Sequence, residues 1–569
     1  MPHRLSPAIS LAALACCGVA VAQAPEPALA PGPRLLEQQQ LQRQQERDKA
    51  LRERLSPDVD VLQPAPAPAA LEMPVNESPC FPLREIRITG ARSEELGWLQ
   101  AAAQDLQRQP CIGAQGVEVI LARLQHALVV RGYLTSRVLV PPQNLQSGVL
   151  EMAFLPGVLR DVRWRPDSAG PASLLRALPT PRGALLQLRD IEQGLENLKR
   201  VPTADADIQI VPAEGEGAEP GQSDLLVSYR QARPWRASLA LDNGGTRSTG
   251  RLQGTATLSW DNPLRRNDLA YLSLGRALRT GAGRGTENAA LHYSVPLGYW
   301  LLGLTASSSR YHQKVAGAYE DYNYSGKSDQ LDARLSRVIH RSASSRTTAG
   351  LRVFHRASAS FVDDTEIEVQ RRRTSGHALS LAQRSYLGAA VFEGQLATQR
   401  GTGAFGALPA PEEPWGEGSA RMRLHTVDLA LNWPLALAGQ RLRLASAWHG
   451  QWNGTPLTPQ DRIGIGGRYT VRGFDGESTL LAERGRYWRN EIALPLKAGA
   501  ELFLALDTGR VSGPSARYLA GRSLTGTALG VRGTGRGFSY ELFVAAPLRK
   551  PEHFQTAHAH LAFNLLYGF

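Results

Sequence analysis

The chain from about residue 235 to Phe569 is a series of short segments in which apolar and polar residues alternate. In the last segment, one face carries Leu561, Phe563, Leu565, Tyr567 and Phe569. In residues 251–260, one face carries Leu252, Gly254, Ala256, Leu258 and Trp260, and the other carries polar residues. Successive side chains of a strand point to opposite faces. Segments of about ten residues with one apolar face, separated by turns, are typical of outer-membrane strands. We predict a transmembrane antiparallel β-barrel of about 16 strands over residues 235–569, wide enough for an aqueous channel unless something fills it.

The amino terminus predicts export. Arg4 precedes an apolar run over residues 9–21 that ends Ala20-Val21-Ala22, so residues 1–22 are interpreted as a signal peptide cleaved after Ala22. Cys16 leaves a lipoprotein signal as an alternative. After this segment the sequence contains no run of about 18 apolar residues, so we predict no transmembrane helix. Without such a helix, only a closed barrel could cross a bilayer. We therefore expect the barrel to lie in the outer membrane of a Gram-negative bacterium and the remaining domains to lie in the periplasm.

Two segments follow the predicted signal peptide. Residues 33–55 are rich in Gln, Glu, Arg and Leu and predict one helix that ends before Ser56-Pro57. Its apolar stripe is too narrow to bury against a core, so the helix is either a solvated tether or a plug for a polar pore. Residues 56–79 contain repeated Ala-Pro pairs and predict a semi-rigid linker.

Residues 80–157 and 158–231 predict two small α+β modules in series. In the first, strand 83–90 is followed by helices 94–107 and 117–130 and by strands 136–140 and 149–154. In the second, strand 159–164 is followed by helices 172–177 and 190–199 and by strands 207–211 and 225–229. The same order of elements occurs twice, which indicates an internal duplication.

Cys80 and Cys111 are the two cysteines that remain after cleavage of the signal peptide. In an oxidising compartment such a pair predicts a disulfide, which would contribute about 3–4 kcal/mol to a small domain. A metal site is the alternative, but two thiols without nearby histidines make a poor one, so we expect no metal and no cofactor. The net charge of +12 favours a basic lumen or contact with anionic lipopolysaccharide over nucleic acid.

The connection over residues 453–486 is longer than a hairpin requires, and long connections are often functional. It contains Gly464, Gly466 and Gly467, followed by the tetrapeptide Val471-Arg472-Gly473-Phe474. Leu502, Leu504 and Leu506 share one face of their strand, which we expect to contact lipid. Because side chains alternate between the two faces of a strand, Asp507 should point into the lumen, and the same alternation in the preceding strand should point Glu491 inward. A charge inside a membrane protein needs a partner. We predict that the loop folds into the lumen and that Arg472 pairs with Asp507, with Glu491 close by.

These features resemble the outer-membrane transporters of two-partner secretion, in the Omp85 superfamily. The resemblance rests on Val471-Arg-Gly-Phe474, on Leu506-Asp-Thr-Gly509, on Leu241-Asp-Asn243 at the start of the barrel and on Cys80-Phe-Pro-Leu83. It covers nearly all of the predicted mature chain. It implies two POTRA-like modules, a loop arginine that contacts an aspartate of the barrel wall, and Phe569 as a carboxyl-terminal assembly signal.

The resemblance also implies a function. Such a transporter recognises a large partner exoprotein (a haemolysin, an adhesin or a contact-dependent inhibition toxin) and translocates it to the cell surface without nucleotide hydrolysis. The barrel-assembly machinery would insert the protein, which we expect to be a monomer. An outer-membrane insertase is the alternative, although insertases usually carry more modules. We expect no enzyme activity, because Ser325-Gly-Lys-Ser328 lacks the context of a phosphate-binding loop and no nucleophile–base arrangement is evident.

Overall fold

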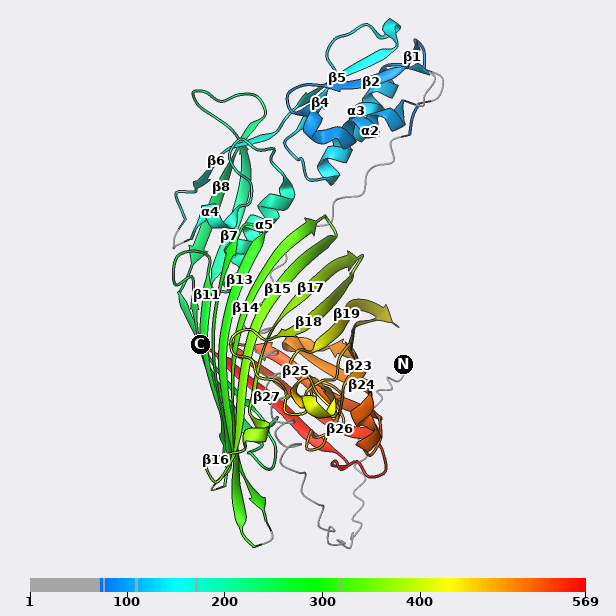
Figure 1. The fold of residues 1–569 in the computed structure, drawn as a ribbon. Helices are drawn as coiled ribbons and strands as arrows, with labels where there is room; N and C mark the ends of the chain where they lie inside the picture. The colour runs from blue at the N-terminus through cyan, green and yellow to red at the C-terminus, as the bar shows by residue number, and fades with distance from the viewer. Residues whose placement is uncertain are drawn as a thin grey trace, which may run out of the picture.

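The computed structural model describes residues 72–74, 77–107, 111–168, 172–281, 283–317, 319–437 and 439–569. Two small α+β modules stand at one end of a large β-barrel (Figure 1). The predicted signal peptide, the predicted helix 33–55 and most of the predicted linker 56–79 lie outside the described residues.

The first module is built around a three-stranded sheet in the order β2-β5-β4, in which β2 and β5 are parallel. Its elements are β1 (Phe81–Pro82), β2 (Glu85–Thr89), η1 (Ser93–Leu96), α2 (Gly97–Leu106), β3 (Cys111–Ile112), α3 (Ala114–Val130), β4 (Arg137–Leu139), η2 (Leu145–Ser147) and β5 (Val149–Leu155). Ile86, Leu150 and Met152 of the sheet are fully buried together with Ile120 and Leu128 of α3. Burial of this apolar surface is the main force that holds the helices on the sheet.

The second module repeats this arrangement, with a sheet in the order β6-β8-β7. Its elements are β6 (Val158–Trp164), α4 (Leu174–Ala177), α5 (Leu188–Lys199), β7 (Ala204–Pro212) and β8 (Gln222–Gln231). The predicted order of strands and helices is therefore observed in both modules. Only α5 differs in character, because its buried residues are mostly polar. These polar residues face the barrel, as described below.

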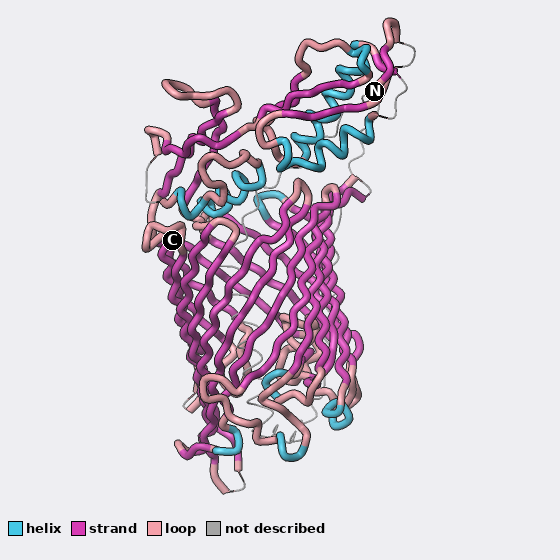
Figure 2. Tube along the Cα trace, turned by 45° about the horizontal axis from the view of Figure 1, so that its top comes forward, coloured by secondary structure: helices cyan, strands magenta, loops and turns pink. Residues whose placement is uncertain are grey.

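Sixteen long antiparallel strands close the barrel, as predicted. They are β9 (Trp235–Asp242), β10 (Leu252–Asp261), β11 (Leu269–Leu278), β12 (Gly285–Leu297), β13 (Trp300–Ala316), β14 (Asp321–Arg341), β15 (Ser345–Val362), β17 (Arg372–Leu387), β18 (Ala390–Thr402), β19 (Arg423–Leu437), β20 (Gln440–Asn453), β23 (Arg484–Pro495), β24 (Ala500–Ser512), β25 (Ser523–Gly535), β26 (Phe538–Arg549) and β27 (His560–Gly568). The short strand β16 (Thr365–Glu366) pairs antiparallel with the last two residues of β15. Figure 2 shows the strands tilted across the wall, as closure of a sheet requires.

The two faces of the barrel wall differ as strand parity predicts. Leu504 and Leu506 of β24 are each 53% exposed on the outside, whereas Phe503, Ala505 and Asp507 point inward and are buried. The wall therefore presents an apolar band to lipid, whereas its inner face carries both charged residues and a buried apolar cluster that includes Phe503 and Ala505. No helix among the described residues is long and apolar enough to span a membrane.

The barrel closes between its first and last strands. β27 pairs with β9 over only five residue pairs, from Asn564–Asp242 to Gly568–Ser238. Beyond the ladder, the side chain of Asn243 donates to Leu561 O at 2.7 Å and accepts from Phe563 N at 2.9 Å. A side-chain amide thus continues the hydrogen bonding where the backbone pairing stops.

Candidate functional site

The long connection between β20 and β23 lies inside the barrel and forms the centre of the candidate site. It contains η5 (Pro459–Asp461) and a small two-stranded sheet of β21 (Ile463–Ile465) and β22 (Leu480–Ala482). Val471, Arg472 and Phe474 are all nearly inaccessible to solvent. The tetrapeptide is therefore packed against other parts of the barrel, and the contacts of each residue define the site.

Arg472 lies between two acidic residues of the wall. Its Nε and Nη2 donate to Asp507 Oδ2 and Oδ1 at 2.8 and 2.9 Å, and its backbone N donates to Asp507 Oδ2 at 2.9 Å. Its Nη1 donates to Glu491 Oε2 at 2.7 Å. The two parallel bonds to one carboxylate are the geometry that arginine makes and lysine cannot. Asp507 is 0% exposed, so this charge depends on Arg472 for neutralisation.

The pair belongs to a larger ionic network on the inner wall. Arg532 of β25 contacts Glu491 and also donates to Glu501 Oε2 at 2.9 Å. Arg443 of β20 donates to the same Glu501 oxygen at 2.7 Å, and Arg489 lies 3.7 Å from Asp507. Four arginines thus surround three carboxylates over four adjacent strands. Because each carboxylate is shared, the loop is tied to the wall as a whole and not to a single strand.

Apolar packing holds the tip of the loop beside the ionic network. Phe474 makes an edge-to-face contact with Phe554, with ring centroids 5.6 Å apart. Gly473 has φ +110°, and a Cβ on it would lie 2.6 Å from Ala546 O and 2.7 Å from Gly526 Cα. Gly526 is equally constrained, because a Cβ there would lie 2.0 Å from Arg472 O. The loop can therefore approach the wall this closely only because both positions are glycine.

A second loop arginine reaches the closure of the barrel. Arg468 Nη2 donates to Asn243 Oδ1 at 2.7 Å, and its Nη1 lies 3.7 Å from Asp242 Oδ1. Asn243 is the residue that bridges β9 and β27. The same loop thus contacts the wall through Arg472 and the closing strands through Arg468.

The second module is docked on the barrel through buried polar contacts. Arg341, at the end of β14, donates to Glu196 Oε1 at 2.6 Å and to Glu192 Oε2 at 3.3 Å, both on α5. The Asn197 side chain donates to Gly298 O of the β12–β13 turn at 2.8 Å. The side chain of Arg341 is only 2% exposed. These contacts join two regions that are far apart in sequence.

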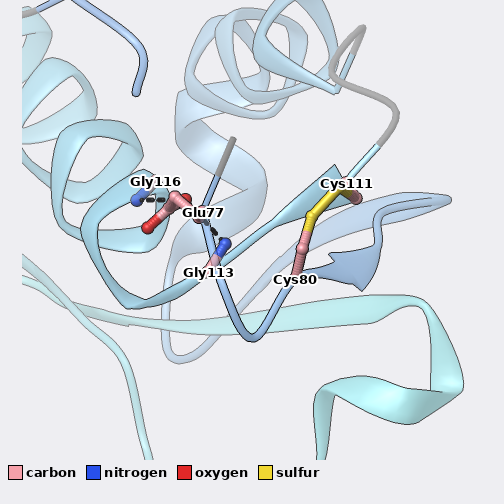
Figure 3. Close-up of a disulfide and its surroundings, with 5 residues drawn as sticks. All are labelled: Glu77, Cys80, Cys111, Gly113 and Gly116. Atoms are coloured by element: carbon pink, nitrogen blue, oxygen red, sulfur yellow. Dashed lines mark hydrogen bonds between the residues drawn. A yellow bond between two sulfur atoms is a disulfide. The ribbon is translucent and has the colours of Figure 1, made fainter. Parts of the chain in front are cut away.

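Cys80 and Cys111 form a disulfide in the first module (Figure 3). Beside it, the carboxylate of Glu77 accepts from the backbone N atoms of Gly113, Gln115 and Gly116 at 2.7, 2.8 and 3.0 Å. These groups lie at the start of α3, where free N–H donors and the helix dipole favour an anion. The chain that enters the module is thus held by a covalent bond and by a helix cap within four residues.

Phe569 lies at the end of the barrel that carries the modules. Its backbone N donates to Ala237 O at 2.9 Å, and its ring makes an edge-to-face contact with Tyr567 at 4.7 Å.

Among the described residues, no group of three or more His, Cys, Asp or Glu side chains could hold a metal ion.

The fold and the lumen site define an outer-membrane transporter in which a β-barrel follows two periplasmic POTRA domains. The chain belongs to the haemolysin secretion/activation protein family ShlB/FhaC/HecB, whose model matches residues 221–533. A ShlB-type POTRA domain matches residues 81–157, and a second POTRA domain matches residues 159–212. It is therefore a two-partner secretion transporter of the Omp85 superfamily.

Named relatives and solved structures agree with this assignment. The chain is 35% identical over 546 residues to outer membrane transporter CdiB-2 of Burkholderia pseudomallei, covering 92% of each chain. It is 25% identical over 460 residues to hemolysin transporter protein ShlB of Serratia marcescens, covering 78% of each. CdiB from Acinetobacter baumannii is similar in structure, with a TM-score of 0.81, 28% identity and coverage of 95% of this chain and 100% of that one. These matches favour the secretion transporter over the insertase alternative.

Sequence reasoning missed several residues of the lumen site. Strand parity could have found Arg443 and Arg532, since both lie at inward positions of their strands. Gly526 also lies at an inward position of β25, opposite Asp507. Arg468 and Phe554 gave no comparable signal, because they lie in loops, which have no periodicity from which a direction can be inferred. The Arg341 contacts were missed as well, since the acids of α5 resemble a solvated helix face.

Proposed function

We propose that this transporter exports a large exoprotein of the contact-dependent inhibition type. The observation that carries the proposal is its identity of 35% over 92% of a chain named as a CdiB transporter. A haemolysin-type partner is the runner-up, supported by the lower identity to ShlB. Expression of the chain with the exoprotein encoded beside it should place that exoprotein on the cell surface. Retention of the exoprotein in the periplasm would reject the proposal.

In this proposal the lumen loop supports the passage of the cargo. Arg472, Asp507 and Glu491 hold the loop against one side of the wall, and Val471, Gly473 and Phe474 pack it there. The unfolded chain passes along the remaining lumen, and its folding outside the cell supplies the driving force without nucleotide hydrolysis. If Arg472→Ala left export at the wild-type level while the amount of folded barrel stayed normal, this role would be wrong.

The first module is a poor acceptor for strand addition as it stands, because glutamine side chains satisfy both edges of its sheet. Gln125 of α3 donates to Ser136 O at 3.0 Å and accepts from Val138 N at 3.2 Å, at the edge strand β4. Gln100 of α2 donates to Ile86 O at 2.8 Å and accepts from Ile88 N at 2.9 Å, at β2. Each glutamine therefore takes the place that an added strand would occupy.

The second module offers the alternative edge. β7 pairs only with β8, over nine residue pairs. Among the described residues, the backbone groups of β7 that hydrogen-bond elsewhere are Ala204 N, to Val201 O, and Ala206 N, to Asp205 Oδ1, both near one end of the strand. An extended exoprotein segment would add to β7 by main-chain hydrogen bonds. A photo-crosslinker at Gln209 of β7 should capture the secretion domain of the exoprotein, whereas one at Arg137 of β4 should not. Capture at Arg137 alone would place the docking site at the first module.

The predicted helix 33–55 has the composition expected of a plug, and in this proposal it leaves the lumen when cargo arrives. Deletion of residues 33–55 should increase single-channel conductance in planar bilayers, and unchanged conductance would reject the plug. We further propose that the transporter works as a monomer, contacts lipopolysaccharide, lacks enzyme activity, and is inserted by the barrel-assembly machinery through a signal that includes Phe569.

A further inference from the structure

A row of basic side chains lies on the outer surface of the barrel near the ends of β17, β18 and β19 that are farthest from the modules. His377 pairs directly with Arg400 across β17 and β18, and Arg400 pairs directly with Arg423 across β18 and β19. The three side chains share the outward face with Leu379, Leu396 and Leu429, which are exposed to lipid. Because the modules are periplasmic, this row belongs to the extracellular half of the wall.

A second row continues the first around the barrel. Arg486 of β23 pairs directly with Arg510 of β24, and both side chains are exposed. They share the outward face with Trp488 and Leu506, which are 49% and 53% exposed. The two rows, His377–Arg400–Arg423 and Arg486–Arg510, are called here the outer basic rows. Arginines placed directly opposite each other repel one another, so each row is unfavourable unless an anion binds to it.

The protein itself supplies no such anion at the described residues. The outward positions beside and above the rows on these strands are Arg, His, Ser, Thr, Trp or Gly, without Asp or Glu. No ion pair within the described part of the chain includes Arg400, Arg423, Arg486 or Arg510. On β13 and β14 the outward face is different, because Lys327 is paired with Asp329 at 2.7 Å. In the extracellular half of the wall, β14 thus compensates an outward charge with a carboxylate, whereas the outer basic rows have no such partner.

The height of both rows matches the level of lipid headgroups. Arg486 is one outward position above Trp488, which corresponds to about 7 Å along a strand. Arg423 is likewise one outward position above His425, which pairs directly with Trp452. Tryptophans on the lipid face of such barrels mark the boundary of the hydrocarbon layer. The arginines therefore stand just outside this boundary, where phosphate groups of the outer leaflet lie.

We infer that the outer basic rows bind the phosphate groups of lipopolysaccharide in the outer leaflet. The planar guanidinium groups suit bidentate phosphate contacts, and neighbouring strands about 4.8 Å apart place two of them within reach of one phosphate. The acyl chains of the same molecule would lie along the apolar band below, on Leu379, Leu396 and Leu429. The ligand would thus neutralise the row that the protein leaves uncompensated.

Binding to delipidated full-length protein tests the inference. Native mass spectrometry with bisphosphorylated lipid A should show a saturable complex. In a background that lacks the second row (Arg486→Gln with Arg510→Gln), Arg400→Gln and Arg423→Gln should each weaken binding about fivefold, and the double variant of the first row about 30-fold. Arg337→Gln is the matched control, because Arg337 faces outward at the opposite, periplasmic end of the wall, over the ring of Trp300. This control should bind lipid A as the wild type does.

Further binding measurements test whether the phosphate groups of lipid A are what the outer basic rows bind. Dephosphorylated lipid A should bind as weakly to the wild type as lipid A does to the double variant, and millimolar inorganic phosphate should not compete. Gel mobility without heating verifies that each variant forms a folded barrel. Binding that is unchanged in the folded double variant would overturn the inference. Equal weakening by Arg337→Gln, equal binding of dephosphorylated lipid A, or full competition by free phosphate would overturn it as well.

Discussion

Two buried arginines, Arg472 in the lumen and Arg341 at the base of the barrel, are each held by two carboxylates, yet their surroundings differ. Arg472 joins a loop to a wall with which it also shares an apolar core around Val471 and Phe474. Arg341 joins the barrel to α5 of the second module, where the neighbouring contacts are polar, such as that between Tyr299 and Asp190. A contact with an apolar core is costly to open, whereas a polar junction can exchange its partners for water.

This difference suggests that the two clusters serve different movements. The lumen loop is fixed on several strands at once, through Asp507 and Glu491 and through the network that includes Arg532. The junction with the second module is made by polar contacts, and the apolar clusters of that module include no residue of the barrel. We therefore expect the module to rock on the barrel more readily than the loop leaves the wall.

Removal of Arg472 should have the largest effect. Arg472→Ala leaves Asp507 and Glu491 buried without their shared cation, and breaking a buried pair from one side costs about 3–5 kcal/mol. The barrel should convert to its unfolded gel mobility at a lower temperature, and export should fall. Arg472→Lys should recover only part of this loss, because lysine cannot form both bonds to Asp507. Full recovery by lysine would show that charge alone matters.

Gly473→Ala tests the contribution of shape without any change of charge. The added Cβ combines a positive φ with contact against Ala546 O and Gly526 Cα, which we expect to cost about 2–4 kcal/mol. The transition in gel mobility should again move to lower temperature. Gly439→Ala is the control, since Gly439 also has positive φ but a Cβ there would meet no atom within 4 Å. Equal effects of the two substitutions would mean that only the backbone strain matters.

Arg341→Gln should affect the junction more than the barrel. It leaves Glu192 and Glu196 at an interface that can open to water, so we expect a cost of about 1–3 kcal/mol. Amide hydrogen exchange should become faster in α5, while the transition in gel mobility should stay near that of the wild type. Arg441→Gln, at an exposed position near the same end of the barrel, should leave exchange in α5 unchanged. A large drop in barrel stability would contradict the distinction between the two clusters.

The two clusters also differ in how far the sequence predicts them. Asp507 could be predicted as a partner of Arg472 because the alternation of β24 places it opposite the lipid-facing leucines, and the long connection suggested a loop in the lumen. Arg341 could not be matched to Glu196 in the same way. The two residues are 145 positions apart, and their contact depends on how two separately folded regions dock, which no local periodicity encodes.

The same limit applies to the modules. The positions of their helices and strands could be predicted because an amphipathic pattern repeats with the period of each element. The roles of Gln100 and Gln125 could not, since a glutamine on a helix gives no sign that it will bond to the edge of a sheet. Side-chain contacts across elements depend on tertiary geometry, and they are where prediction from one sequence ends.

The smallest expected effect concerns a third cluster, in which one carboxylate is shared by two arginines. Asp224 of β8 accepts from Arg160 at 2.9 and 2.5 Å and also contacts Arg163. These bonds hold the pKa of Asp224 below its ordinary value, with the hydrogen bond from Arg160 as the main cause. Asp224 is therefore ionised in the folded module at pH values where the unfolded chain already binds a proton.

The sign of the pH dependence follows from this depressed pKa. The contribution to stability is fully present above the ordinary pKa of an aspartate, about 4, and is lost as pH falls through the lower pKa of the folded state. Asp224→Asn should therefore lower the stability of the second module at pH 7, and the difference from the wild type should shrink on acidification below pH 4. Hydrogen exchange in β8 at several pH values would measure it. Because both arginines remain partly exposed, solvent screens the pair, and the difference should be smaller than that caused by Arg341→Gln. A larger difference would mean that the module's own charge cluster, and not its junction with the barrel, limits its stability.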